Sequence, residues 1–256
     1  MAWKAFIRSL IERTGYTIRA LPTARTVYDQ DGLSSVHNHD FMDDPAFQRA
    51  YARGCQAAGD YHWHWRIHLG LWSAATAARL DGDFVECGVN RGFLSSAVMQ
   101  FLDWNATGRT FYLLDTFAGI DVAQIDDQRD RVDAETRNAE HFRSGFYVRG
   151  IESVTANFAE WNNVRIIPGS VPATLNQITS SAIAWLHLDM NCAEPERAAL
   201  ETLWDRLVPG AVVLMDDYAY RGFDAQKHAM DEFAASRGVM IASLPTGQGL
   251  LLKPPK

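Results

Sequence analysis

Short apolar runs alternate with longer amphipathic stretches in the chain beyond residue 80. Seven runs have the length and composition of strands, and they lie at 84–87, 110–114, 164–167, 183–188, 211–215, 239–243 and 250–253. Helical stretches separate the first five, so these strands should be parallel and covered by helices on both faces. Only the turn sequence P-T-G-Q-G separates the last two. The pattern predicts a doubly wound, Rossmann-like α/β fold with a seven-stranded, mostly parallel sheet that ends in an antiparallel hairpin.

The first 80 residues have a helical pattern instead. Two helices are expected between residues 45 and 80, and an amphipathic helix near the N-terminus is indicated by Trp3, Phe6, Ile7, Leu10 and Ile11 at helical spacing. We therefore divide the chain into an N-terminal helical appendage at 1–80, which also supplies a substrate-covering segment, and a catalytic domain at 81–256. The apolar surface of the aromatic helical segment before residue 80 favours a homodimer.

Charge narrows the range of partners. The chain has 24 Lys and Arg against 31 Asp and Glu, a net charge of -7, which excludes nucleic acid as a general partner. Residues 1–28 are locally basic, with Lys4, Arg8, Arg13, Arg19 and Arg25 against Glu12 alone. This arm is expected to pack on the domain or on a second subunit, and weak peripheral contact with a membrane is the alternative.

The chain lacks the marks of a membrane-integral or secreted protein. No apolar run approaches the roughly 20 residues of a membrane span, and the first residues lack the apolar core of a signal peptide. Three cysteines without a C-x-x-C motif argue against a disulfide framework and a structural zinc. A cytoplasmic location is expected. His62, His64 and His68 in the H-W-H-W segment are assigned to packing, because His62 and His64 are two residues apart and would lie on different faces of a helix, which leaves His64 and His68 as the pair at i, i+4 spacing.

A glycine-containing turn follows the first predicted strand, in the sequence E-C-G-V-N-R-G. Glu86 ends the strand, and Gly88, Asn90 and Gly92 lie in the turn before a helix, where the backbone comes close to a ligand. The dinucleotide fingerprint G-x-G-x-x-G is absent, which disfavours a pyrophosphate. An acidic strand end suits a ligand with an ammonium group, such as S-adenosylmethionine, although a purely structural turn also favours glycine.

The next two strands supply further candidates for cofactor binding. Asp115 ends the second strand, where an acid accepts hydrogen bonds from ribose hydroxyls in doubly wound sheets. The alternative is that Asp115 only caps the following turn. Ser170, after the third strand, is placed to meet an adenine edge.

Three aspartates follow the fourth and fifth strands. Asp189 ends one, and Asp216 and Asp217 end the other. Adjacent parallel strands lie about 4.8 Å apart, so these carboxylates should repel each other unless a cation neutralises them. Hard oxygen ligands indicate Mg²⁺, with Mn²⁺ or Ca²⁺ as alternatives. The opposing interpretation is that the Asp pair caps the next helix.

The chemistry predicted for this arrangement is methyl transfer to oxygen. A hydroxyl group bound to a dication has a lowered pKa and a fixed oxygen, while the sulfonium donor is already activated. Candidate bases are Asp189, which doubles as a metal ligand, His187 on the same strand, and His141. His187 also fits the role of a buried, hydrogen-bonded strand residue.

Taken together, these motifs resemble the macrocin O-methyltransferase family. The resemblance rests on G-D-F-V-E-C-G-V-N-R-G, L-L-D-T-F, L-D-M-N and P-G-A-V-V-L-M-D-D-Y, and runs from about residue 40 to the C-terminus. It implies a class I methyltransferase that uses S-adenosylmethionine and acts on a sugar hydroxyl of a glycoside or a related small molecule. It also implies that Asp189, Asp216 and Asp217 hold magnesium.

Two departures from the family pattern concern the acceptor. The family commonly shows D-x-D-x-Y after the fourth strand, whereas this chain has D-M-N-C, with Asn191 in place of the second acid and Cys192 in the following segment. The acceptor pocket is therefore expected to differ. Alternative functions are an oxidoreductase or hydroxylase on the same fold, and a non-catalytic binding subunit.

Overall fold

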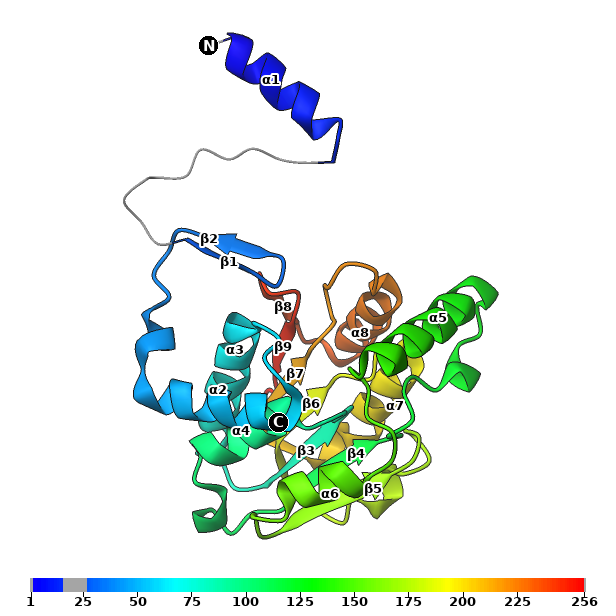
Figure 1. Cartoon of the computed structure of the whole chain (residues 1–256). Coiled ribbons are helices and arrows are strands. Elements are labelled where there is room, and N and C mark those ends of the chain that lie inside the picture. The colour runs from blue at the N-terminus through cyan, green and yellow to red at the C-terminus, as the bar shows by residue number, and fades with distance from the viewer. Residues whose placement is uncertain (1, 16–26, 256) are drawn as a thin grey trace. The chain divides into compact units, whose positions relative to one another are not determined.

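The computed structural model describes residues 2–15 and 27–255, which form two compact units, Met1–His39 and Asp40–Lys256 (Figure 1). The first unit contains α1 (Ala2–Glu12) and the antiparallel pair β1 (Tyr28–Gln30) and β2 (Leu33–Ser35). Trp3, Phe6 and Leu10 are exposed on α1, so the predicted amphipathic helix is present. Of the predicted basic arm, Arg19 and Arg25 lie outside the described residues.

The hairpin of β1 and β2 was not predicted from the apolar pattern. Asp31 and Gly32 connect its strands with φ angles of 51° and 70°, the left-handed conformation that a two-residue Asp-Gly turn requires. The D-G pair in the sequence was the available signal.

The second unit is built on a seven-stranded sheet with the order β5-β4-β3-β6-β7-β9-β8. The strands are β3 (Asp83–Cys87), β4 (Phe111–Asp115), β5 (Val164–Pro168), β6 (Ile183–Leu188), β7 (Leu207–Met215), β8 (Ala242–Ser243) and β9 (Gly249–Leu252). The five strands from β3 to β7 are parallel where they pair, and β9 is antiparallel to both β7 and β8. The predicted fold class is confirmed, including the C-terminal antiparallel pair.

Helices cover both faces of this sheet, as Figure 1 shows. One face packs against α2 (Pro45–Ala58), α3 (His64–Ala77), α4 (Phe93–Phe101) and α6 (Glu152–Phe158), and the other against α7 (Ala193–Leu203) and α8 (Asp224–Arg237). Alternate residues of the central strands enter opposite cores, as Phe84 and Val85 of β3 do. The helix α5 (Gln128–Ser144) contributes Ala134 to a small third cluster.

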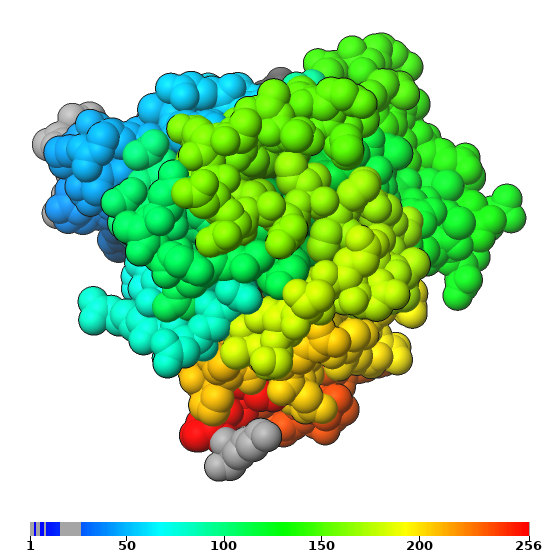
Figure 2. All heavy atoms as spheres, turned by 90° about the horizontal axis from the view of Figure 1, so that it is seen from below, coloured from blue at the N-terminus to red at the C-terminus, as the bar shows by residue number. Residues whose placement is uncertain are grey.

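The described residues also form five short 3₁₀ segments: η1 (Asp40–Asp43), η2 (Trp104–Ala106), η3 (Val122–Gln124), η4 (Leu175–Gln177) and η5 (Trp204–Arg206). Seen from below, the surface is formed mainly by segments from the middle of the chain, with the C-terminal segment at its edge (Figure 2). Within the ranges described, no helix is both long and apolar enough to cross a bilayer.

The helices α2 and α3 belong to the compact unit that begins at Asp40, and their side chains enter its main core. The sequence-based division at residue 80 placed them in the appendage. Their histidines take part in aromatic packing: His64 stacks on Tyr51 at 4.4 Å between ring centroids, and His68 on Phe41 at 4.1 Å. These contacts agree with the packing role expected for the H-W-H-W segment.

Candidate active site

The carboxyl ends of β3, β4, β6 and β7 lie at one edge of the sheet. From β3 the chain crosses to β4 on one side, whereas from β6 it crosses to β7 on the other. In open α/β sheets, ligands bind outside the carboxyl ends of the strands where the connections diverge in this way. The segments that follow these four strands therefore form the candidate site.

Two glycines shape the turn between β3 and α4. Gly88 has a φ of 95°, and a Cβ added there would lie 1.8 Å from the carbonyl oxygen of Asp189. Gly92 has a φ of 82° and forms the N-cap of α4, where a Cβ would lie 2.4 Å from the ring of Phe158. Only glycine fits either position without strain, because both combine a left-handed backbone with a close neighbour.

Asp115, at the end of β4, binds this turn. Its Oδ2 atom accepts hydrogen bonds from the backbone N–H groups of Val89 and Asn90, both at 2.7 Å, and its Oδ1 atom accepts one from Phe117 N–H at 2.6 Å. The turn-capping alternative is therefore realised. An ionised carboxylate has about four acceptor positions, so this arrangement leaves room for a ribose hydroxyl as well.

Asn90 and Ser170, two further predicted cofactor residues, are also held by the protein. Asn90 donates from Nδ2 to the carbonyl oxygen of Phe146 at 3.0 Å and accepts at Oδ1 from Val148 N–H at 2.9 Å, which fixes the segment after α5 against the glycine turn. Ser170 donates its hydroxyl to the carboxylate of Asp121. Asp121 was not singled out from the sequence, because an acid in a loop carries no distinguishing pattern; in the structure it is half-buried.

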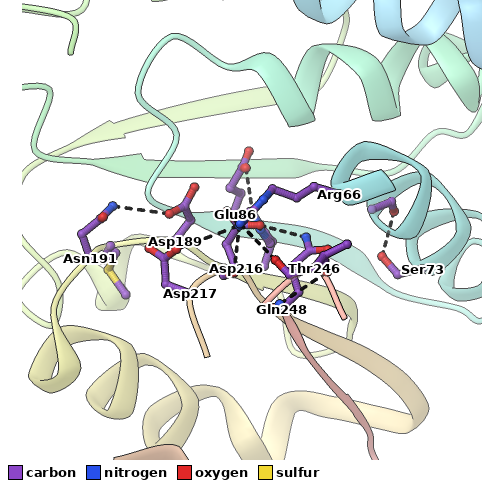
Figure 3. Close-up of polar contacts among 12 residues, drawn as sticks. Arg66, Ser73, Glu86, Asp189, Asn191, Asp216, Asp217, Thr246 and Gln248 are labelled. Carbon is purple, nitrogen blue, oxygen red and sulfur yellow. Dashed lines mark hydrogen bonds and ion pairs between the residues drawn. The ribbon is translucent and has the colours of Figure 1, made fainter. Parts of the chain in front are cut away.

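The three predicted aspartates gather beyond β6 and β7. In Figure 3, Asp189 and Asp217 lie next to each other, with Asp216 beside them. Burial and the charges of Asp216 and Asp217 raise the pKa of Asp189 well above its usual range. Burial and the charge of Asp216 raise the pKa of Asp217 to about 7. Both shifts show that negative charge is crowded at this edge.

The principal cation among them is Arg66, which the sequence analysis missed. Its buried side chain extends from α3 toward the aspartates (Figure 3), and its Nη1 atom lies 2.5 Å from Oδ2 of Asp216 and 3.9 Å from Oδ1 of Asp217. Although burial opposes ionisation, Arg66 and His187 hold the pKa of Asp216 below its usual range. Arg66 is the single Lys or Arg residue of α3, and its position within this largely apolar helix was the available signal for a buried ion pair.

His187 bridges two acids inside the sheet. It is the register neighbour of Glu86, whose Oε1 atom lies 2.9 Å from His187 Nδ1, and its Nε2 atom lies 3.8 Å from Oδ1 of Asp216. Burial lowers the pKa of His187, but its contacts with Asp216 and Glu86 outweigh burial and raise the pKa to about 10. The imidazole is thus protonated at neutral pH, and a protonated imidazole accepts no further proton.

His141 lies apart, near the end of α5. Its ring contacts those of Phe146 and Tyr147, each at 4.7 Å between centroids. Burial and the charge of Arg137 lower the pKa of His141, so it is neutral at pH 7 and able to accept a proton. Of the three candidate bases, His141 lies apart from the three aspartates and His187 is protonated, which leaves Asp189 as the base at this edge of the sheet.

Features of β3 and α4 fit S-adenosylmethionine. Glu86 is buried, and its Oε2 atom accepts no hydrogen bond from the described residues, which leaves an acceptor for an ammonium group. The helix α4 begins without a side-chain cap, so its first N–H groups suit a carboxylate.

The aspartates fit a hard dication in their chemistry, but one of them is already engaged. Both oxygens of Asp216 have partners, Arg66 Nη1 at 2.5 Å and Gln248 Nε2 at 2.8 Å. From the residues that the structure describes, the Asp189 carboxylate accepts only a long contact of 3.4 Å from Asn191 Nδ2. Among residues 2–15 and 27–255, no three His, Cys, Asp or Glu side chains are gathered closely enough to form a ready metal site.

Comparison with known proteins gives a consistent result. The model of a protein family described as Macrocin-O-methyltransferase matches residues 71–243. A 4'-O-methyltransferase of 8-demethyl-8-(2,3-dimethoxy-alpha-L-rhamnosyl)-tetracenomycin-C from Streptomyces olivaceus is 34% identical over 62% of this chain and 60% of that protein. Demethyldecarbamoylnovobiocin O-methyltransferase from Streptomyces niveus is 29% identical over 61% of this chain and 59% of that protein. The chain thus spans about 60% of the length of these relatives.

Solved structures agree on the fold. The O-methyltransferase NovP superimposes with a TM-score of 0.62 and 25% identity, over 74% of this chain and 80% of that one. The calicheamicin methyltransferase CalS11 gives a TM-score of 0.51 and 15% identity over 85% of this chain and 94% of that one, a likeness of fold alone.

Proposed function

Because the chain belongs to the macrocin O-methyltransferase family, we propose that it transfers the methyl group of S-adenosylmethionine to a hydroxyl group of a sugar or glycoside. The names of the relatives support this acceptor class, since one is named for a rhamnosyl-bearing compound and another for demethyldecarbamoylnovobiocin. Asn191 stands where the family pattern D-x-D-x-Y has its second acid, so we expect an acceptor of this class that differs from those of the relatives.

The cofactor is proposed to bind at the carboxyl ends of β3 and β4. Glu86 would receive the ammonium group through its Oε2 atom, and the uncapped N-terminus of α4 the carboxylate. Asp115 would hold the ribose while fixing the glycine turn by three backbone hydrogen bonds, and Ser170 would face the adenine. In these roles the residues would direct the reactive methyl group toward β6 and β7, next to the aspartates.

Deprotonation of the acceptor is assigned to Asp189. It belongs to the aspartates that follow β6 and β7, and burial with the neighbouring charges raises its pKa, which makes its ionised form a stronger base than an exposed aspartate. His141 remains a second candidate because it is neutral at pH 7, whereas protonated His187 is better suited to orienting Glu86 and Asp216. A Mg²⁺ ion held by Asp189, Asp217 and Asp216 would lower the pKa of a coordinated hydroxyl and fix its oxygen.

The observation that carries the proposal is the meeting of the Glu86 acceptor and the crowded aspartates at one sheet edge. The test is mass spectrometry after incubation with S-adenosylmethionine labelled in its methyl group and a panel of demethylated glycosides. A labelled methyl on the sugar fragment, lost in Asp189→Asn, is expected. Label transfer to no acceptor, combined with binding of NADH, would favour an oxidoreductase instead.

A homodimer and a cytoplasmic location remain predictions.

A further inference from the structure

Arg66 joins three separate elements around one carboxylate. It comes from α3, and its Nη1 atom donates to the backbone oxygen of Asp216 at 2.9 Å as well as to the side chain at 2.5 Å. Its Nη2 atom donates to the carbonyl oxygen of Thr246 at 3.3 Å, in the turn between β8 and β9. The guanidinium group is therefore held by two backbone carbonyl oxygens as well as by its ion pair with Asp216.

The same network occupies the other oxygen of Asp216. Gln248 donates from Nε2 to Oδ1 of Asp216 at 2.8 Å, and Thr246 donates its hydroxyl to Oε1 of Gln248 at 2.9 Å. Asp216, Thr246 and Gln248 are all buried (Figure 3). A metal ion that used Asp216 as a ligand would therefore have to displace a partner that is already desolvated and well placed.

The local charges explain why a cation is needed at all. The buried acids Glu86, Asp189, Glu196, Asp216 and Asp217 act on one another at this edge, and the buried cations Arg66 and His187 lie among them. Removing one partner of a buried ion pair leaves an uncompensated charge, which is strongly unfavourable. Arg66 supplies in the metal-free protein part of the positive charge that a dication would supply.

We propose that Arg66 competes with a divalent metal ion for Asp216, so that it sets the metal affinity of the site as a positioning residue. The inference rests on the proposed function, in which the three aspartates hold Mg²⁺. Two binding events that share one ligand and are mutually exclusive there are negatively coupled, and the coupling acts equally in both directions. Metal binding should release Arg66 from Asp216, and loss of Arg66 should tighten metal binding.

The test is calorimetric titration of Mn²⁺ and of Mg²⁺ into the full chain and into Arg66→Met, which keeps an apolar side chain of similar length. Arg53→Met is the matched control, because Arg53 is also largely buried but pairs with Glu160 instead. We expect Arg66→Met to bind Mn²⁺ about tenfold more tightly than the unsubstituted chain, a typical coupling strength. Arg53→Met should bind as the unsubstituted chain does. Equal or weaker binding by Arg66→Met would overturn the proposal.

A second readout covers the case in which Arg66→Met does not fold. Arg66→Lys retains the charge but loses the two-pronged contact, and it should bind Mn²⁺ with an affinity above that of the unsubstituted chain. Mn²⁺ should also raise the melting temperature of the Arg66 variants more than that of the unsubstituted chain. Equal increases in melting temperature for the Arg66 variants and the unsubstituted chain would contradict the competition.

Titration with S-adenosylhomocysteine separates this inference from the proposed function. If all variants bind S-adenosylhomocysteine and also bind metal with equal affinity, only the proposed role of Arg66 is refuted. Failure of every variant to bind metal refutes both the competition and the magnesium part of the proposed function. Failure to bind the cofactor product refutes the methyltransferase assignment itself.

Discussion

The two halves of the sheet edge hold their acids in opposite ways. Beyond β4, Asp115 accepts three backbone N–H hydrogen bonds and has its charge distributed over fixed dipoles. Beyond β6 and β7, the carboxylate of Asp189 has a single long hydrogen-bond contact within the described part of the chain, and Asp216 depends on the side chains of Arg66 and Gln248. The first half is a rigid turn in which an acid is satisfied locally. The second is a group of acids balanced by residues from distant parts of the chain.

This difference separates two tasks of a group-transfer site. A backbone-satisfied turn keeps its shape whether or not a ligand is present, which suits the binding of a cofactor in one orientation. Crowded carboxylates with raised pKa values respond to cations and protons instead, which suits proton removal and metal binding.

The largest expected effect on stability comes from removing Arg66, the cation that α3 supplies to the aspartates. Arg66→Met should destabilise the metal-free protein by about 4 kcal/mol, because it leaves Asp216 buried without its main partner. Urea unfolding in the presence of a chelator measures the change. Arg53→Met should cost less, since Glu160 is largely exposed to solvent. Equal costs for the two variants would show that the aspartates do not depend on Arg66.

The next effect concerns the point where the two halves touch. Gly88→Ala should cost about 3 kcal/mol, because the added Cβ meets the carbonyl oxygen of Asp189 at 1.8 Å on a backbone with a φ of 95°. Gly108→Ala is the control: its φ is 69°, but a Cβ there meets nothing within 4 Å. Thermal unfolding should show a markedly smaller loss for Gly108→Ala, and similar losses would assign the whole effect to backbone strain.

On the side of β4, Asp115→Ala should cost about 2 kcal/mol, since three backbone N–H groups lose their acceptor. It should also weaken binding of S-adenosylhomocysteine in a calorimetric titration. Asp127→Ala removes two comparable backbone hydrogen bonds at the exposed start of α5 and should leave this binding unchanged. Unchanged binding in Asp115→Ala would separate the turn from the cofactor site.

The smallest expected effect has the opposite sign. Asp217→Asn should stabilise the metal-free protein by about 1 kcal/mol at pH 8, because it removes a charge that the fold disfavours. The pKa of Asp217 rises from 3.8 to about 7 on folding, so its ionisation costs stability as the pH rises through this window. The gain should vanish below about pH 3, where the acid is protonated in both the folded and the unfolded state. A stability gain that does not depend on pH would contradict the account in which negative charge is crowded around Asp217.

The sequence predicted the sheet well because its determinants are local. Apolar runs bounded by turn residues located all seven strands, and the short P-T-G-Q-G turn predicted the antiparallel end that β8 and β9 form. Strand ends then placed Asp189 beside Asp216 and Asp217, since adjacent parallel strands end at the same edge. The β1 and β2 hairpin was overlooked because its strands are only three residues long.

The partners of the site residues were much harder to predict. Arg66 and Asp216 are separated by 150 positions, and no spacing rule relates a residue of α3 to the end of β7. The pairing of Glu86 with His187 depends on the exact register of β3 and β6. The sequence therefore identified which acids gather, but only the tertiary structure showed which cations balance them.

The most direct test of the account is calorimetric titration of the full chain with S-adenosylhomocysteine and, separately, with NADH. The account predicts one tight site for S-adenosylhomocysteine, weakened in Glu86→Gln, and no binding of NADH. Binding of NADH without S-adenosylhomocysteine, or cofactor binding that is indifferent to Glu86, would contradict the site proposed at the ends of β3 and β4.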